Sequence, residues 1–111
     1  IQAQLQTIDT WEVEQLGYLL NLLKTTKDRD GSTLLDSTLV IFASEVSDGN
    51  SHDHTGLPVL LAGRLGGTVR PGRHLRRNEP IANLYTSILN AVGVPSTKFG
   101  EDGTGPLQGL S

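Results

Sequence analysis

The 111-residue chain contains no cysteine and no methionine, and only 5% of its residues are aromatic. Without cysteine it has no disulfide bonds and no thiolate metal sites, so any metal must be bound by imidazole and carboxylate groups. No apolar run approaches the roughly 18 residues that would indicate a transmembrane helix. The sequence therefore predicts no membrane span.

Neither sign of charge dominates, since 9 Lys+Arg stand against 12 Asp+Glu for a net charge of −3. This balance argues against a general nucleic-acid-binding protein. Five of the nine cations nevertheless gather in one segment, as Arg64, Arg70, Arg73, Arg76 and Arg77. A guanidinium matches phosphate, sulfate or carboxylate, which makes Arg70 and Arg73 candidates for binding an anion. The alternative is a solvated hairpin that uses the long apolar stems of arginine.

The length suits one domain, and a chain of this size can bury roughly two-thirds of its unfolded surface. It begins at Ile1 and has no Met. We expect residues 1–111 to be the C-terminal portion of a larger α/β domain, with the rest of the full-length chain as their partner.

The N-terminal part has the pattern of one amphipathic helix, predicted over residues 10–27. Asp9 and Glu12 match a capping box, and Ile8 with Val13 fits a hydrophobic staple. The apolar positions then recur at helical spacing, at Val13, Leu16, Leu20 and Leu23. Trp11 and Tyr18 are expected to pack within the fold.

Two apolar strands are predicted next, at residues 39–43 and 57–62. The first is continuously apolar, which is typical of a strand covered on both faces in an α/β protein. Pro71 and Gly72 then suggest a small hairpin between residues 68 and 75. Pro80 fits the first position of a second helix, with Asn78 or Glu79 as its cap and Gly93 at its end. The tail is expected to be irregular coil.

The loop after the first strand, residues 44–56, holds most of the potential metal ligands. His52 and His54 are two residues apart, so on an extended segment both would point the same way. Glu45 is a third candidate ligand, and Asp48 or Asp53 can ligate or orient an imidazole. A divalent ion such as zinc, manganese, iron or calcium is the predicted cofactor. The loop follows the carboxyl end of a strand, where ligands bind in open α/β sheets.

Other interpretations of this loop remain open. It can be a surface turn followed by solvated polar residues. It does not match the EF-hand calcium loop, because Gly49 directly follows Asp48 and the bidentate Glu is missing. Ser44 or Ser47 with a histidine and a carboxylate would make a triad, but neither has a nucleophile-elbow pattern. His74 lies among arginines and is interpreted as structural.

Several segments together resemble the bacterial "domain of unknown function 1552" family. The most specific is the Ser-Asp-Gly-Asn-x-His-x-His pattern that ends at His54. The segments that carry the resemblance are Leu35–Phe42, Ser44–His54, Leu57–Gly63, Gly72–Leu75, Asn83–Tyr85 and Gly93–Pro95. More distantly, the chain is similar to the alkaline phosphatase and sulfatase superfamily.

This resemblance implies a fold, an activity and a location. The fold would be the C-terminal fragment of an alkaline-phosphatase-like three-layer α/β sandwich, in the order helix-strand-loop-strand-hairpin-helix. Glu45 would take the position of a metal-binding acid and His54 that of a later His ligand, with His52 as an additional or second-sphere group. A periplasmic or cell-surface location is also implied, although residues 1–111 contain no signal-peptide pattern.

Two functions follow as hypotheses. The first is part of a metal-dependent hydrolase acting on a small phosphate or sulfate ester, whose nucleophile comes from outside this sequence. The second is a non-catalytic binding or structural module of the same fold.

Overall fold

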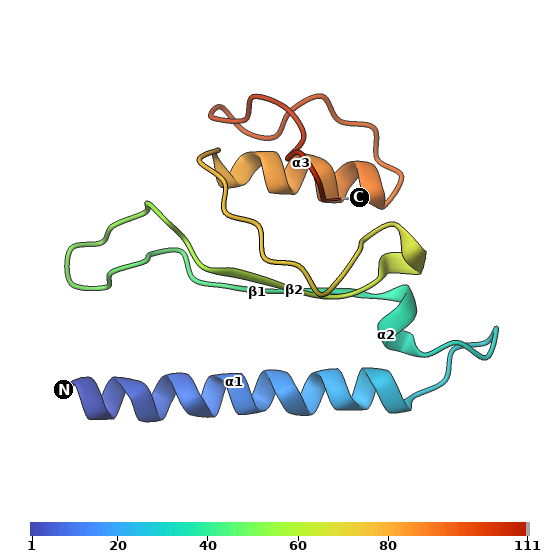
Figure 1. The fold of residues 1–111 in the computed structure, drawn as a ribbon, viewed down its shortest axis with the longest axis horizontal. Helices are drawn as coiled ribbons and strands as arrows, with labels where there is room; N and C mark the ends of the chain where they lie inside the picture. Colours follow the sequence, from blue (N-terminus) through green and yellow to red (C-terminus); the bar gives the residue numbers. More distant parts are fainter. Residues whose placement is uncertain (111) are drawn as a thin grey trace.

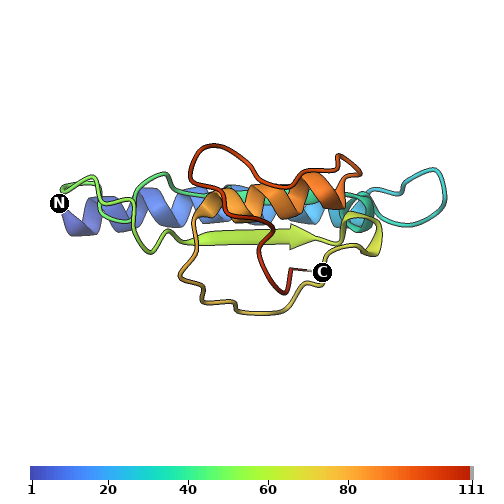
Figure 2. The ribbon, with the colours of Figure 1, turned by 90° about the horizontal axis from the view of Figure 1, so that it is seen from above.

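The computed structural model describes residues 1–110 and arranges them in three layers (Figure 1). A two-stranded antiparallel sheet, β1 (Leu39–Ala43) and β2 (Val59–Gly63), lies between helices α1 (Gln2–Thr25) and α3 (Ile81–Ala91). The layers overlap when the molecule is seen from above (Figure 2), so they are stacked. Helix and strand are thus mixed, as the α/β expectation requires at this coarse level.

Helix α1 begins eight residues earlier than predicted, at Gln2 instead of Thr10. The Asp9–Glu12 capping box is therefore wrong, because Asp9 lies inside the helix and a cap residue needs a non-helical backbone. No Gly or Pro interrupts residues 2–9. The hydroxyls of Thr7 and Thr10 donate hydrogen bonds to the carbonyls four residues earlier, at 2.9 and 2.7 Å, which is compatible with a helical backbone. The helix also ends earlier, at Thr25, where Thr26 turns to an extended conformation.

A short helix that the sequence analysis did not predict, α2 (Leu34–Ser37), leads into β1. Its cap is a reciprocal box: the Thr33 hydroxyl accepts from the Asp36 amide, and the Asp36 carboxylate accepts from the Thr33 amide at 3.0 Å. The Thr-x-x-Asp spacing was available in the sequence as a capping signal. The box fixes the turn from which β1 starts.

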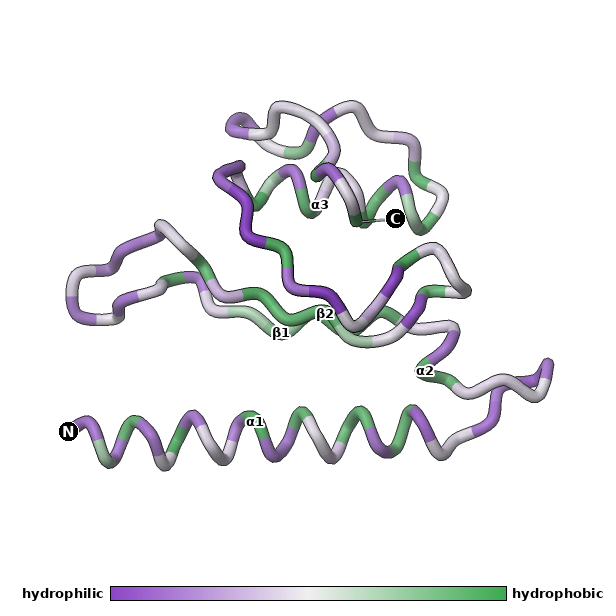
Figure 3. The backbone as a smooth tube through the Cα atoms, viewed as in Figure 1, coloured by the Kyte–Doolittle hydropathy of each residue, from purple (hydrophilic) through white to green (hydrophobic). Residues whose placement is uncertain are grey.

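Strands β1 and β2 pair in continuous register, from Leu39 opposite Gly63 to Ala43 opposite Val59. β1 matches its predicted range, and β2 begins two residues later than expected. The two strands form a continuous hydrophobic stretch, whereas the loop that joins them is hydrophilic at its tip (Figure 3). This contrast places the ligand-rich loop in solvent, beyond the layers.

The hairpin predicted over residues 68–75 is wrong. After a 3₁₀ turn at Leu65–Gly67, residues 70–80 have no regular structure. The cause lies in the hydrogen bonds of this segment: the Val69 amide donates to the Arg64 carbonyl at 3.1 Å, and the Arg73 Nε donates to the Arg70 carbonyl at 3.1 Å. The backbone is thus held by local turns and a side chain, not by a partner strand.

Helix α3 starts one residue after Pro80, so Pro80 is the cap position and the expected side-chain cap from Asn78 or Glu79 is wrong. Its end is as predicted. Gly93 has a φ of 84°, its amide donates to the Asn90 carbonyl at 3.1 Å, and the Val94 amide donates to the Leu89 carbonyl at 2.9 Å. These two bonds define a Schellman motif, which needs the left-handed conformation that glycine adopts without strain.

The tail after Val94 is irregular coil wrapped around α3, as expected for the described part; Ser111 lies outside the described residues. The Tyr85 and Phe99 rings pack edge to face with centroids 5.3 Å apart. The most buried apolar side chains of residues 1–110 come from α3, the coil before it and the tail, namely Val69, Ala82, Leu84 and Leu110. The core of the described chain therefore lies on the α3 side of the sheet.

Helix α1 is poorly covered by comparison. Trp11 and Tyr18 are 59% and 63% exposed, so the expectation that they pack within the fold is wrong for this structure. The radius of gyration is 15.8 Å, whereas about 13 Å is typical of a compact domain of this length. The layers are thus stacked without being closed into a compact core.

Candidate functional site

The loop between β1 and β2 is a hairpin that extends past the N-terminal end of α3 (Figure 1). Its two arms are joined at Asp48 and Asp53, which form an isolated antiparallel bridge. The Ser47 amide donates to the Asp53 carbonyl at 2.7 Å, and the Asp53 amide donates to the Asp48 carbonyl at 3.2 Å. Residues 49–52 make the turn at the tip, so the polar stretch has a defined backbone.

The two aspartates shape this turn with their carboxylates. Asp48 accepts hydrogen bonds from the amides of Asn50 and Ser51, at 2.8 and 2.9 Å. Asp53 accepts from the amide and hydroxyl of Thr55, at 2.8 and 3.0 Å. Both carboxylates thus bind loop donors, and neither hydrogen-bonds to an imidazole. Their proposed role in orienting a metal ligand stays a prediction.

These hydrogen bonds stabilise the ionised aspartates. The Ser51 and Asn50 amides hold the pKa of Asp48 below its ordinary value, and the Thr55 amide and hydroxyl do the same for the pKa of Asp53. A hydrogen bond to the charged form of a carboxyl group favours that form. Both groups therefore remain anionic acceptors into acidic solution.

A pH titration should show this directly. Because the folded pKa values are depressed, the stabilisation they give the hairpin is fully present above the ordinary value of 3.8 and is lost as the pH falls through the folded values. The NMR shifts of the two side-chain carboxyl carbons should accordingly titrate below 3.8. Added salt should change these midpoints little, since hydrogen bonds are the leading cause. Titration of either group above its ordinary value would contradict the loop geometry.

The two histidines do not share a direction. His52 has a φ of 53° and lies in the turn, so the premise that residues 52 and 54 form one extended segment is wrong. His54 lies on the returning arm, where its Nδ1 is 2.8 Å from the main-chain carbonyl oxygen of Glu45. A carbonyl only accepts, so Nδ1 carries the proton and donates it. In the neutral ring, Nε2 is then left with a free lone pair.

This arrangement of His54 has a chemical consequence. Histidines that bind metals usually donate their other ring N–H to a carbonyl or carboxylate, which fixes the tautomer and the ring orientation. Glu45 supplies that acceptor with its backbone, two residues after the end of β1. Of the three residues predicted as metal ligands, His54 is thus the one whose ring is already oriented by a hydrogen bond.

The remaining ligands do not converge on His54. Within residues 1–110, no three His, Asp or Glu side chains form a group that can hold a metal ion. The described residues therefore do not fit a complete metal site, although they supply one oriented imidazole. The assignment of Glu45, His52 and His54 as a metal set stays a prediction.

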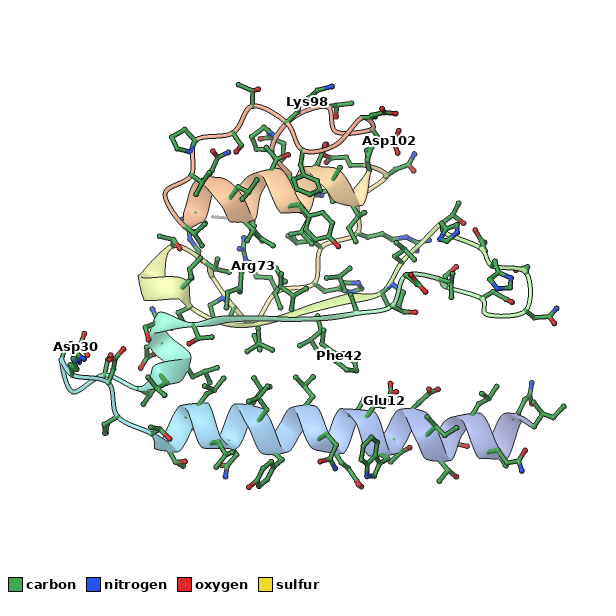
Figure 4. The ribbon with its side chains drawn as sticks, turned by 180° about the vertical axis from the view of Figure 1, so that it is seen from behind. Glu12, Asp30, Phe42, Arg73, Lys98 and Asp102 are labelled. Atoms are coloured by element: carbon green, nitrogen blue, oxygen red, sulfur yellow. The ribbon has the colours of Figure 1, made fainter. Side chains whose placement is uncertain are left out.

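The structure places Arg73 elsewhere, between α3 and the sheet (Figure 4). Its Nη1 and Nη2 donate to the carbonyls of Gly109 and Leu110, at 2.6 and 2.7 Å. Together with the bond from Nε to Arg70, these contacts make Arg73 a clamp on the tail. Arg70 is exposed, and its guanidinium makes no hydrogen bond within residues 1–110. Anion binding by Arg70 and Arg73 stays a prediction, and neither side chain is joined to the loop by a hydrogen bond.

Asn83, on α3, has a structural role that its sequence pattern does not predict. It is 2% exposed, and its side chain binds Glu79 on one side and Thr104 and Gly105 of the tail on the other. The local signal was weak, since a single Asn within an apolar helical stripe does not name a partner twenty residues away. Its role is to fasten the tail to the helix.

No protein-family model matches this chain, and neither the curated proteins nor the solved structures contain a significant match. The resemblance described above accordingly stays a prediction. None of the helices formed by residues 1–110 has the length and hydrophobicity needed to cross a membrane.

Proposed function

We propose that residues 1–111 are part of a metal-dependent hydrolase of phosphate or sulfate esters, resembling the alkaline phosphatase and sulfatase superfamily. The observation that supports this most is the hydrogen bond from His54 Nδ1 to the Glu45 carbonyl, which orients the ring and leaves the Nε2 lone pair free to bind a metal. The bound ion, which can be zinc, manganese, iron or calcium, would supply Lewis-acid stabilisation of the ester's developing charge. The remainder of the polypeptide would supply the nucleophile and the missing ligands.

In this proposal the residues of the chain have separate tasks. His54 binds the metal through Nε2, and the Glu45 backbone holds the ring. The side chains of His52 and Glu45 are exposed and make no hydrogen bond within residues 1–110, so they can turn toward a shared ion. The Arg70 guanidinium, which is exposed and makes no hydrogen bond within residues 1–110, would bind the anionic substrate, whereas Arg73 keeps the tail in place. A periplasmic or cell-surface location remains part of the proposal.

The test is the metal content of the intact protein, purified without chelator, in four variants. His54→Ala and the His52→Ala/His54→Ala double variant should each lower metal affinity by about 100-fold or more, because they remove a ligand. His74→Ala is the matched control, since it deletes an exposed imidazole outside the loop. Glu45→Gln distinguishes a role of the side-chain carboxylate from that of the backbone carbonyl. Loss of metal would show that the carboxylate is a ligand, and retention of metal would show that Glu45 acts only by orienting His54.

The alternative is a non-catalytic binding or structural module. The observation in its favour is that the loop carboxylates are occupied by the loop's own amides and that no three-residue ligand group occurs within residues 1–110. Absence of stoichiometric metal from the wild-type protein would favour this module over the hydrolase. Unchanged metal content in the double variant would exclude the loop as the metal site.

A further inference from the structure

The outer edge of β1 has no partner in the described structure. β1 pairs with β2 along one side only, and no hydrogen bond joins Leu39–Ala43 to any other segment of residues 1–110. In an antiparallel pair, part of each strand's N–H and C=O groups point away from the partner. Those of β1 therefore form a bare row of donors and acceptors, which is a template for another strand.

The sequence of β1 lacks the features that protect natural edge strands. Exposed edges are usually blunted by charged residues, proline or a bulge. Leu39-Val40-Ile41-Phe42-Ala43 has no charge and no proline, and its five consecutive pairs with β2 leave no room for a bulge. Side chains on both faces are apolar, which is typical of a strand inside a sheet that is covered on both sides.

Helices α1 and α3 are displaced from β2 toward the outer edge of β1. In Figure 2, β2 lies to one side of α1 and α3, so the helices cover the β1 side of the sheet. A helix with its side chains is about 10 Å wide, and neighbouring strands are about 5 Å apart, so one helix covers roughly two strands. Because β2 lies to one side of the helices, the two strand positions under each helix are β1 and the position next to β1 on the side away from β2.

We infer that β1 is an interior strand of a larger sheet, and that its outer edge pairs with an apolar extended strand from the remainder of the same polypeptide. Two copies paired through β1 would be related by a two-fold axis between the strands. That axis would bring their α1 helices to within about one strand spacing, about 5 Å, whereas packed helices need about 8–10 Å. A single strand meets the bare hydrogen-bonding groups without this clash.

This inference rests on the proposed function for one point only, namely that residues 1–111 belong to a longer polypeptide that supplies the strand. Its test is residue-resolved hydrogen exchange of the intact protein, which requires neither metal nor activity. All five amides of β1 should exchange at least about 1,000-fold more slowly than in an unstructured peptide, including those that point away from β2. The amides of Gly49 and His52 at the hairpin tip, which donate no hydrogen bond within residues 1–110, provide the unprotected reference.

Light scattering on the same sample separates the two sources of a strand. Full protection of β1 in a monomer supports a strand from the same polypeptide. Protection that appears only in a dimer and disappears on dilution overturns that assignment in favour of a second copy. Alternating protection, in which only the amides directed at β2 are slow, overturns the interior-strand assignment itself. Each of these results leaves the metal content of the loop as a separate question.

Discussion

Replacing Gly63 by alanine should destabilise the intact protein by about 3 kcal/mol or more. Gly63 is buried at the end of β2 with a φ of 99°, a conformation that residues with a Cβ rarely adopt. A Cβ at this position would also overlap the carbonyl oxygen of Thr38, just before β1. That oxygen belongs to the backbone and accepts a hydrogen bond from the Leu65 amide at 3.2 Å, so moving it away from the methyl group would distort the backbone and weaken this bond.

Gly66→Ala is the matched control for this prediction. Gly66 also has a positive φ, 67°, but a methyl group added there would meet no atom within 4 Å. Its replacement should cost about 1 kcal/mol, which reflects the left-handed backbone alone. Urea unfolding of both variants measures the difference. Equal losses at the two positions would show that the close approach of Gly63 to Thr38 does not exist in the protein.

Replacing Asn83 by leucine should cost about 3 kcal/mol and release the tail, because it removes the hydrogen bonds of a buried side chain, each of which contributes about 0.5–1.5 kcal/mol. The Asn83 Oδ1 accepts from the amides of Thr104 and Gly105, at 2.9 and 3.3 Å. Its Nδ2 donates to Glu79 and to the Thr104 hydroxyl, at 2.9 and 3.0 Å. Leucine has a similar size but no polar atom, so it would leave these partners unpaired.

Asn90→Leu tests whether burial is the reason. Asn90 makes a similar pair of bonds to Ser96, at 2.8 and 3.0 Å, but its side chain is exposed. Water can replace these partners, so the expected cost is below about 1 kcal/mol. Urea unfolding gives the stability, and limited proteolysis shows whether the tail beyond Ser96 becomes cleavable. A tail that stays protected in Asn83→Leu would assign its attachment to Arg73 instead.

The sequence by itself determined the features whose cause lies within a few residues. The helical spacing of Leu16, Leu20 and Leu23 placed the middle of α1, and the run Leu39–Ala43 marked the bounds of β1. Gly93 marked the end of α3 because a Schellman motif needs only local hydrogen bonds. The polar hairpin after β1 was also apparent as the richest collection of ligands.

The start of α1 shows where even a local pattern was insufficient. Asp9 and Glu12 match a capping box, but residues 2–8 contain no residue that stops a helix, so the helix continues through the cap. A capping pattern describes a boundary only when the preceding residues leave the helical conformation. Conversely, Thr33 and Asp36 form a real capping box, and it starts the short helix α2, which no apolar periodicity predicts.

Only the tertiary structure decided which polar side chains already have hydrogen-bond partners. Spacing presented His52 and His54 as a pair, but the turn at the hairpin tip separates them, and a carbonyl nine residues away orients His54 alone. Likewise, Arg73 has the pattern of a free cation until the tail, 36 and 37 residues further on, presents its carbonyls. Side-chain chemistry is fixed by residue type, whereas its availability depends on contacts between segments that are distant in the sequence.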